Sequence, residues 1–261
     1  MAPDDEPAVL ELIDTDWLPG QQPAHELLTP AGESPQEAET LVVCDLHGTV
    51  AGVVRCQVRA ADGARLIVWL HGREDSETIA ALITLAQAHL GDRLLHACTG
   101  PATATGIPGL PTGHRPVTAR ALTAAGFTPA STQRYFLRDL AGAPPPPPAY
   151  PLADVTDLTE PAGWRLELTD TDGQPLASAT LLAPAPATAG MAVLSQLTVQ
   201  PRRRRRGIGS HLLAQCLHHA HANGAGHVTA VIPEGGTAAA RLLAGAGFLL
   251  LDTLTVYRSR P

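Results

Sequence analysis

Lysine is absent from this 261-residue chain, so all 18 basic residues are arginine. A phosphate-binding P-loop ends in Gly-Lys-Ser/Thr, so nucleotide hydrolases of that class are excluded. Aromatic residues make up only 3% of the chain, too few for a platform on which nucleic-acid bases stack. The formal net charge of −7 also provides no broad basic field for a phosphate backbone.

Long apolar runs are missing as well. No uninterrupted apolar run reaches the roughly 18 residues of a membrane helix. The first six residues, Met-Ala-Pro-Asp-Asp-Glu, are acidic and are not followed by an apolar secretory segment. The four cysteines are scattered without a Cys-x-x-Cys pair, which favours reduced, buried thiols over a disulfide framework. We therefore expect a cytoplasmic protein.

The most informative segment of the sequence is residues 194–213. An apolar strand runs into Pro201, five arginines (Arg202–Arg206) and two nearby glycines (Gly207 and Gly209) follow, and an amphipathic helix then begins. The first N–H groups of a helix have no intrahelical acceptor, and the helix dipole favours an anion at the same place. Glycine has no Cβ and lets backbone approach a phosphate closely. This pattern predicts a pyrophosphate-binding turn.

The turn is not a dinucleotide-binding fingerprint, because Leu212 stands where that motif has its third glycine. It resembles the acetyl-CoA signature of the GCN5-related N-acetyltransferases (GNAT), Arg/Gln-x-x-Gly-x-Gly/Ala, and the Leu-x-Val-x-Pro that precedes it. The two motifs read here Arg204-Arg205-Arg206-Gly207-Ile208-Gly209 and Leu197-Thr198-Val199-Gln200-Pro201. The resemblance implies acetyl-CoA as cosubstrate. It assigns the pantetheine arm to Leu197, Thr198 and Val199, and the pyrophosphate to Arg204, Arg205, Arg206, Gly207, Ile208, Gly209 and Ser210.

The five consecutive arginines also have other interpretations. A solvated charge run, a nuclear-localisation signal and a nucleic-acid patch share this composition. The negative net charge and the scarcity of aromatic residues argue against a nucleic acid as partner. We therefore expect the arginines to face the phosphates of one small ligand, and we expect neither a nucleic-acid nor a membrane partner.

The chain divides at a proline-rich segment, Ala141–Ala149. The 261-residue length of the chain, with 44% hydrophobic and 16% charged residues, predicts two globular domains. The five prolines Pro144–Pro148 favour a stiff polyproline II spacer, or else a ligand for a proline-binding module. On either side, Ala119–Phe127 and Ala240–Phe248 both read Ala-Arg-x-Leu-x-x-Ala-Gly-Phe. A short helix that ends at a glycine before a strand explains the repeat, which also resembles the second GNAT motif.

These observations predict an α/β fold of two tandem GNAT-like domains, each a mixed, mostly antiparallel sheet flanked by helices. We expect a degenerate GNAT-like domain at residues 1–140, a linker at 141–149 and an acetyl-CoA-binding GNAT domain at 150–261. In the first half the expected elements are a strand Val9–Ile13, a Pro-broken helical stretch at 20–39, strands Thr40–Cys44, Val50–Val58 and Ala64–Leu70, a helix Ser76–Leu90, and strands Leu94–Cys98 and Gln133–Leu137. In the second half they are strands Trp164–Thr169, Pro175–Leu182 and Met191–Val199, a helix Ile208–Asn223, a strand His227–Ile232, a helix Thr237–Ala246 and a strand Leu254–Arg258.

The first half lacks a phosphate-binding turn. The segment His71–Glu77, directly after the strand expected at Ala64–Leu70, contains one glycine and three acids. Carboxylates at this place repel a pyrophosphate. We therefore expect the N-terminal copy to bind no coenzyme and the C-terminal copy to bind it.

Acetyl transfer to an amine requires a base for the ammonium proton, donors for the oxyanion and an acid for the leaving thiolate. The GNAT resemblance places the usual tyrosine acid at Leu243 and the usual strand acid near Ser195 and Gln196, so both groups are replaced here. Glu234 is the candidate base, with a helix-capping carboxylate as the alternative. Ser195 is a candidate neighbour of the acetyl group or a half-buried strand serine. Tyr257 is a candidate acid or a packing tyrosine.

Four histidines lie on the helix expected at residues 208–223: His211, His218, His219 and His221. His218 and His221 are one turn apart, a separation that can hold a metal. The apolar positions of the helix place most of these histidines on its polar side, so we expect a solvated face and no metal. Cys216 falls on the apolar side, which predicts a core position and not a nucleophile.

The sequence thus predicts an N-acetyltransferase that moves an acetyl group from acetyl-CoA to an amine of a small molecule or peptide. We expect direct attack in a ternary complex, because no cysteine stands out as an acyl carrier. The alternative is a non-catalytic acyl-CoA-binding or regulatory module, since the usual tyrosine and strand acid are missing.

Overall fold

The computed structural model describes residues 3–16, 18–19, 24–28, 38–91, 93–103, 106–184 and 190–259. The chain forms two compact units: the first unit comprises residues 1–132 and 252–261, and the second unit comprises residues 133–251. Both divisions fall inside strands, in β6 (Phe127–Asp139) and in β12 (Leu249–Ser259). The expected linker at residues 141–149 therefore lies within the second unit, and the unit boundaries differ from the expected domain boundaries.

The first element of the chain is a helix, so the prediction of a strand at Val9–Ile13 was wrong. Helix α1 spans Glu6–Thr15, and its buried side chains are Val9, Leu12 and Ile13. These positions follow the i, i+3, i+4 spacing that places apolar residues on one face of a helix. A short apolar run is compatible with either structure, and here the helical spacing decides.

Helix α2 spans Ala24–Leu28, within the stretch at residues 20–39 for which a broken helix was predicted. Strand β1 then begins at Ala38. The other positions of that stretch, 20–23 and 29–37, lie outside the described residues.

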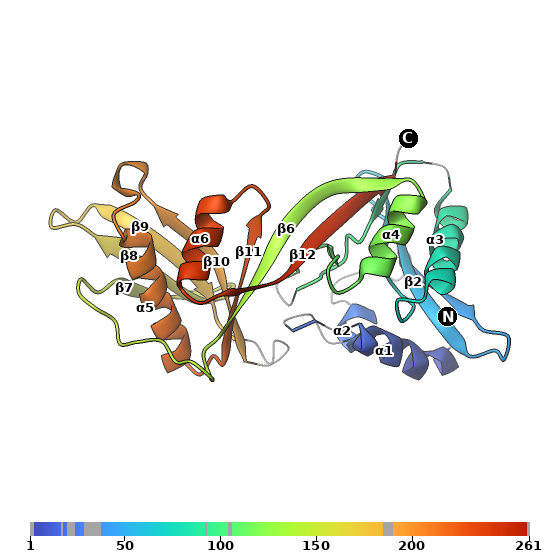
Figure 1. Cartoon of the computed structure of the whole chain (residues 1–261), viewed down its shortest axis with the longest axis horizontal. Helices are drawn as coiled ribbons and strands as arrows, with labels where there is room; N and C mark the ends of the chain where they lie inside the picture. The colour runs from blue at the N-terminus through green and yellow to red at the C-terminus, as the bar shows by residue number, and fades with distance from the viewer. Residues whose placement is uncertain are drawn as a thin grey trace. The chain divides into compact units, whose positions relative to one another are not determined.

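The sheet of the first unit has the strand order β1-β2-β3-β4-β12, and β5 pairs with β12 (Figure 1). Its strands are β1 (Ala38–Cys44), β2 (Val50–Val58), β3 (Arg65–His71), β4 (Leu95–Ala97) and β5 (Leu110–Pro111). Strands β3 and β4 are parallel, and the other pairs are antiparallel. The predicted hairpin and the mixed, mostly antiparallel sheet are confirmed.

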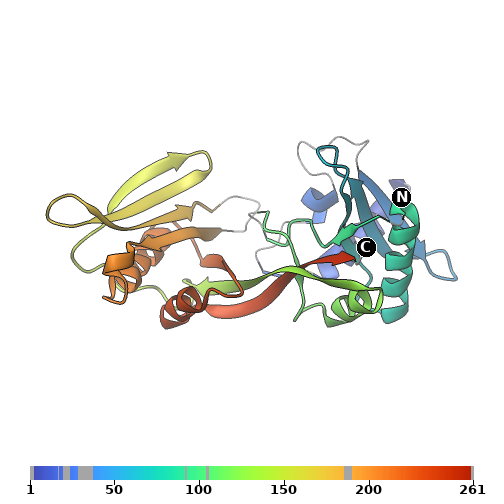
Figure 2. The ribbon, with the colours of Figure 1, turned by 90° about the horizontal axis from the view of Figure 1, so that it is seen from above.

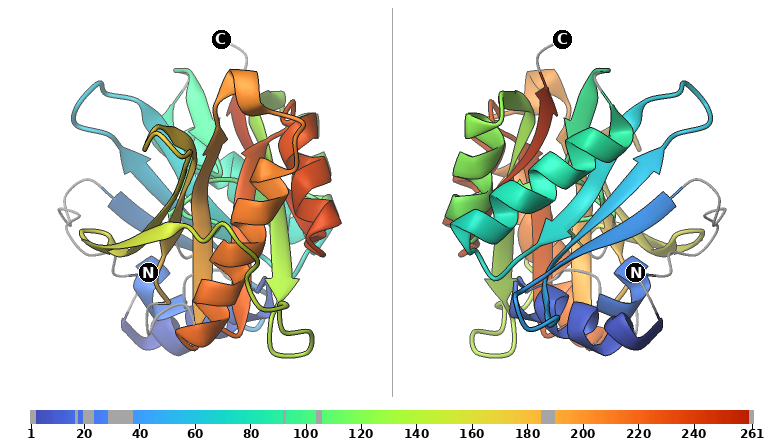
Figure 3. Two further views of the ribbon diagram at one scale, coloured as in Figure 1. Left: turned by 90° about the vertical axis from the view of Figure 1, so that its left-hand side faces the viewer. Right: turned by 90° about the vertical axis from the view of Figure 1, so that its right-hand side faces the viewer.

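Helices cover both faces of the first unit's sheet. Val54 and Ile67 point into the core beneath α3 (Ser76–Leu90) and α4 (Pro116–Ala124). Val53 and Leu66 point into the core with α1 and α2. Neighbouring residues of a strand face opposite sides of a sheet, which explains how each strand serves both cores. The right-hand view of Figure 3 shows α3 lying across these strands.

The second unit carries helices on one face of its sheet (Figure 2). The strand order is β6-β11-β10-β9-β8-β7. The strands are β7 (Asp154–Thr159), β8 (Ala162–Thr169), β9 (Pro175–Leu182), β10 (Met191–Val199) and β11 (His227–Pro233); the helices are α5 (Ile208–Ala222) and α6 (Thr237–Gly245). The predicted bounds of β9 and β10 are confirmed, whereas β7 was not predicted. In the described part of the chain, no helix has the length and apolar composition needed to span a membrane.

The last strand of each half of the sequence pairs with strands from the other half. Gln133–Asp139 of β6 pairs with β11, and β12 pairs with β4 through Tyr257 and Arg258. The order β1-β2-β3-α3-β4-α4-β6 is repeated as β8-β9-β10-α5-β11-α6-β12. Because each copy ends in the same helix–strand pattern, the final strand of either copy can complete either sheet. Here β6 completes the sheet of the second unit and β12 that of the first, so the unit boundaries do not coincide with the proline-rich segment.

All four cysteines are free, as their spacing predicts. Cys44 is exposed, whereas Cys56, Cys98 and Cys216 are buried. Burial raises the pKa of each buried thiol to about 12. These three thiols are therefore protonated at neutral pH, and thiols are poor nucleophiles compared with thiolates.

Candidate functional site

Strands β10 and β11 separate in the middle of the second unit's sheet. They pair in parallel from Met191 with His227 to Leu194 with Ala230. Beyond this point, residues 196–199 pair only with β9, and residues 231–233 pair only with β6. The backbone N–H and C=O groups that face the gap have no strand partner, so they are available to a ligand.

A bulge at Ser195 marks the point of separation. The pairing of β10 with β9 shifts its register between Leu194 and Gln196. Ser195 is exposed there, and its hydroxyl donates a hydrogen bond to the Thr180 carbonyl oxygen at 3.2 Å. Bulges of this kind redirect side chains beside functional sites. The Ser195 proton is used within the sheet, so its oxygen can accept a hydrogen bond from a ligand.

The turn between β10 and α5 has the backbone of an anion site. A 3₁₀ turn at Pro201–Arg203 leads to Arg205 and Gly207, whose φ angles of +59° and +78° lie in the left-handed region. Gly207 is the N-cap of α5, and no side chain caps this helix. The first N–H groups of α5 therefore lack a capping acceptor, and left-handed residues in such turns make N–H groups converge on an anion.

The five arginines of the turn are all exposed, but two of them are engaged within the unit. Arg204 donates from Nε to the Val199 carbonyl oxygen at 3.1 Å, which ties the turn to the end of β10. A guanidinium nitrogen of Arg203 lies 3.7 Å from a carboxylate oxygen of Asp170. The remaining three, Arg202, Arg205 and Arg206, form no ion pair with any acid in the described residues.

We expect Arg206→Ala to weaken CoA binding by about tenfold, because a charge-assisted hydrogen bond to a phosphate contributes roughly 1.5–3 kcal/mol. Arg202→Ala is the matched control, since Arg202 is equally exposed but lies on the strand side of the turn. An exposed charge contributes about 1 kcal/mol or less, so we expect a change of less than about fivefold. Calorimetric titration with CoA at fixed ionic strength measures both. The opposite ranking would contradict the assignment of the turn.

Glu234 is the first residue after β11, at the open end of the gap. Its backbone carbonyl accepts a hydrogen bond of 2.7 Å from Nη2 of Arg134, and its side chain is exposed. The carboxylate makes no hydrogen bond or ion pair with a described residue, and α6 has no side-chain cap. The structure therefore does not bear out the alternative of a helix-capping carboxylate.

Tyr257 belongs to the first unit. Its side chain is only 4% exposed and belongs to the core with Ile67 and Leu122. Burial and the neighbouring Cys98 raise the pKa of Tyr257 to about 12. Both observations favour the packing role over the acid. Leu243, at the position of the family's usual tyrosine, is buried in the second unit's core.

Arg134 is the residue at this site that the sequence analysis missed. It precedes the proline-rich segment and was assigned with the first domain, yet β6 places it opposite Ile232 of β11. No local pattern marks it, because its proximity to Glu234 depends on a pairing between residues 100 positions apart.

Two of the four histidines of α5, His211 and His219, have structural contacts within the second unit. Nε2 of His211 lies 2.7 Å from the Pro151 carbonyl oxygen, and His219 meets the ring of Trp164 edge-on at 4.8 Å. No group of three or more potential metal ligands is found within the residues that the structure describes.

Comparison with known proteins identifies the second unit. Residues 134–248 match the model of the Acetyltransferase (GNAT) family. The chain carries a GNAT domain. The match begins at Arg134 in β6 and ends just before β12, so it covers nearly all of the second unit. The predicted family is thus confirmed. None of the curated proteins matches the sequence.

Solved GNAT structures share the fold along the whole chain. A GCN5-related N-acetyltransferase from Sphaerobacter thermophilus has a TM-score of 0.62 at 18% identity, over 100% of this chain and 95% of that one. A tandem GNAT protein from the clavulanic acid biosynthesis pathway has a TM-score of 0.58 at 14% identity, over 98% and 94%. A GNAT-family acetyltransferase from Colwellia psychrerythraea has a TM-score of 0.56 at 12% identity, over 100% and 98%. These similarities concern the fold, and they agree with the predicted fold class.

In the first unit, carboxylates occupy the helix ends near the turn that follows β3. Asp75 caps α3 by accepting a hydrogen bond of 2.8 Å from the Thr78 amide. Glu74 accepts from the amides of Val117 and Thr118, at 2.7 and 3.2 Å, at the start of α4. In the GNAT domain of the second unit, the corresponding end of α5 has no such cap. The acids after β3 therefore fill positions that an anionic ligand would need.

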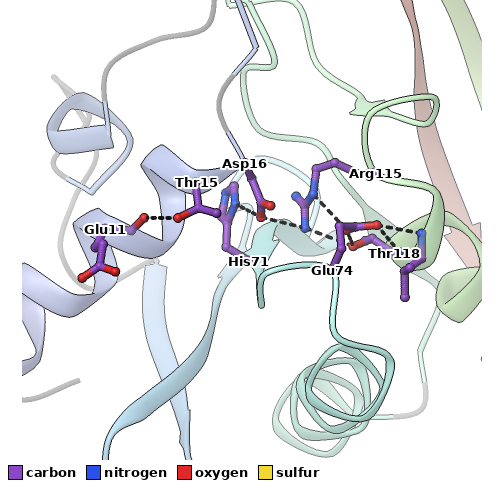
Figure 4. Close-up of polar contacts among 8 residues, drawn as sticks. Glu11, Thr15, Asp16, His71, Glu74, Arg115 and Thr118 are labelled. Atoms are coloured by element: carbon purple, nitrogen blue, oxygen red, sulfur yellow. Dashed lines mark hydrogen bonds and ion pairs between the residues drawn. The ribbon is translucent and has the colours of Figure 1, made fainter.

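Glu74 also belongs to a buried polar cluster of the first unit, shown in Figure 4. Nδ1 of His71 lies 2.9 Å from Oδ2 of Asp16, and Nη2 of Arg115 lies 3.3 Å from the same oxygen. Nε of Arg115 donates to Glu74 at 3.3 Å, and Nη2 donates to the Thr118 hydroxyl at 3.0 Å. The cluster joins the end of α1, the end of β3 and the start of α4.

Burial lowers the pKa of His71, and the hydrogen bond to Asp16 offsets this effect only in part. Burial acts in the opposite direction on Asp16, but the hydrogen bond from His71 and the charge of Arg115 outweigh it and lower the pKa of the carboxyl. At neutral pH, His71 is therefore uncharged and donates its Nδ1 proton to the Asp16 carboxylate.

We expect the protein to lose stability as the pH falls below about 6.5, the pKa of histidine in an unfolded chain. The folded-state pKa of His71 is lowered, so the unfolded chain binds more protons in this range, and acid favours unfolding. Above about pH 6.5, the contribution of neutral His71 to the free energy of unfolding is fully present. Melting temperatures between pH 7.5 and 5.0 test this, with His71→Gln as the comparison. The variant lacks the titrating ring, and an identical pH dependence in both proteins would contradict the prediction.

Proposed function

We propose that the protein is an N-acetyltransferase that uses acetyl-CoA and acetylates an amine of a small molecule or peptide. The observation that carries the proposal is the continuity of the site. The gap between β10 and β11 leads along Leu197–Val199 to the left-handed turn and the uncapped start of α5. A ligand with a hydrogen-bonding arm and a pyrophosphate at its end fits this arrangement.

In the proposed complex, the pantetheine arm pairs with the backbone of Leu197, Thr198 and Val199, which faces the gap. The pyrophosphate lies on the backbone N–H groups and side chains of Arg204–Ser210. Gly207 keeps this surface open, because no heavy atom outside its chain neighbours lies within 4 Å of a Cβ built on it. A Cβ on Gly209 would instead lie 3.4 Å from the Val199 side chain, so Gly209 serves the packing of α5 on β10. The charge of Arg206, which has no described acidic partner, compensates the phosphates.

The proposed reaction is direct. The amine nitrogen attacks the thioester carbonyl carbon, the carbonyl oxygen becomes an oxyanion, and backbone N–H groups of β10 in the gap stabilise it. Glu234 takes the proton that the nitrogen loses. The C–S bond then breaks, the thiolate leaves, and it takes a proton from water. An acyl-cysteine intermediate at Cys216, the cysteine of the second unit, is disfavoured because burial raises the pKa of its thiol to about 12. Tyr257 has no part in this scheme, since it is buried in the first unit.

The second candidate function is a non-catalytic acyl-CoA-binding module. The substitution of Leu243 for the family's tyrosine favours it, because Leu243 cannot protonate a thiolate. Release of free CoA thiol from acetyl-CoA, in the presence of a panel of small and peptide primary amines, separates the two. Amine-dependent release supports the transferase. CoA binding without release from any amine supports the module.

We expect one CoA to bind per chain. In the first unit, Asp75 caps α3 and Glu74 occupies the amides at the start of α4, so the equivalent turn repels a pyrophosphate. Calorimetric titration of the full chain should give a stoichiometry of one, and Gly207→Val should strongly weaken that binding. Two equivalent sites would contradict the assignment of the coenzyme to the second unit.

A further inference from the structure

The first unit contains a small cavity of about 40 Å³ beside its buried cluster. It lies where β3 and β4 part: their last pair is Ile67 with Ala97, and the following residues Val68 and Trp69 of β3 line the cavity. Most of the residues that line it are apolar, and Leu110 is one of them. The cavity has room for a few heavy atoms.

Two buried polar side chains, His71 and Arg115, also line this cavity. They are 7% and 4% exposed, so more than nine-tenths of each is buried. Asp16 engages Nδ1 of His71, and Nε2 has no hydrogen-bond partner among the described residues. Asp16, Glu74 and Thr118 engage Nε and Nη2 of Arg115, and Nη1 has no partner among them. A polar atom at a cavity wall that has no protein partner favours a ligand or water, and this holds for both atoms.

The protonation state of the cluster determines what these atoms offer. His71 donates its Nδ1 proton to Asp16, so Nε2 carries a lone pair and accepts a hydrogen bond. Nη1 of Arg115 can only donate. A ligand group that both donates and accepts satisfies the two, and a hydroxyl and a primary carboxamide are such groups.

The charges around the cavity disfavour ionic ligands of either sign. A carboxylate would lie near Asp16 and Glu74, which already share the single guanidinium of Arg115. An ammonium would be repelled by that guanidinium, and neutral His71 carries no negative charge to attract it. In a buried site, such like-charge contacts are weakly screened. An uncharged head group avoids both.

We propose that this cavity is a binding site for a small uncharged ligand with a carboxamide or hydroxyl head and a short apolar part. The head lies between Nε2 of His71 and Nη1 of Arg115, and the apolar part contacts Val68, Trp69 and Leu110. The site belongs to the first unit and does not depend on coenzyme binding in the second.

Acetamide, acetate and acetamidinium test the proposal, because they share one planar shape and differ in charge. Each is titrated into the full chain to about 100 mM, since ligands of so few atoms bind weakly. The His71 ring signals, followed by NMR, report on Nε2. Tryptophan fluorescence in a background that carries Trp17→Phe and Trp164→Phe reports on the cavity wall, because Trp69 is then the remaining tryptophan. We expect acetamide to shift the His71 signals and to bind about tenfold more tightly than either ion.

Val68→Leu adds bulk to the cavity wall while leaving His71 and Arg115 in place, and we expect it to abolish acetamide binding. Val58→Leu makes the same change at an exposed end of β2 and should bind as the unmodified protein does. Far-ultraviolet circular dichroism and melting temperature establish that both variants are folded. Tighter binding of acetate or acetamidinium, binding that survives Val68→Leu, or no binding of any of the three compounds would overturn the proposal.

Discussion

Gly207→Val is expected to raise the dissociation constant for CoA by about 100-fold, or about 2.7 kcal/mol. Gly207 has a φ angle of +78°, and a β-branched residue is strongly disfavoured there. No heavy atom outside its chain neighbours lies within 4 Å of a Cβ placed on this residue. The effect on binding therefore comes from the altered turn and from the new side chain in the space proposed for the pyrophosphate. Calorimetric titration with CoA measures it.

Gly224→Val is the matched control, because Gly224 lies just past the other end of α5 with a φ angle of +85° and equally open space. Both variants carry the same backbone strain, so we expect similar decreases in melting temperature. Only Gly207→Val should lose CoA affinity. Equal affinities in the two variants would show that the turn does not hold the coenzyme.

Glu234→Gln is expected to lower turnover by at least about 100-fold, since general bases contribute about 100-fold to 10,000-fold in rate. The amide keeps the size of the carboxylate but cannot take the ammonium proton. The carboxylate has no structural partner in the described residues, so melting temperature and CoA affinity should stay unchanged. Initial rates of thiol release with a reactive amine, together with CoA titration, separate the chemical step from binding.

Glu160→Gln makes the same chemical change at another exposed glutamate of the second unit, in the turn between β7 and β8. We expect its turnover to equal that of the unmodified protein. A decrease of less than about tenfold in Glu234→Gln would mean that water or another group takes the proton. A parallel loss of CoA affinity would make Glu234 a binding residue.

The sequence alone was sufficient where structure is determined by neighbouring residues. The predicted helix Ser76–Leu90 and strand Met191–Val199 have the observed bounds. The periodicity of apolar residues and the turn residues that flank them lie within one short window of sequence, so both could be recognised locally. The turn at Arg204–Gly209 was predicted for the same reason: its left-handed glycine and the helix that follows are adjacent in the chain.

The tertiary structure decided which distant segments meet. Only the pairing of β6 with β11 brings Arg134 to Glu234, and only the packing of α1, β3 and α4 joins Asp16, His71 and Arg115. It also decided that Val9–Ile13 is helical, since one buried face against the sheet selects between two structures that a short apolar run permits. The two copies end in equivalent helix–strand patterns, so local sequence does not specify which sheet each final strand completes. That choice depends on pairs of residues far apart in the sequence, such as Gln133 with Pro233 and Ala97 with Tyr257, which no local window contains.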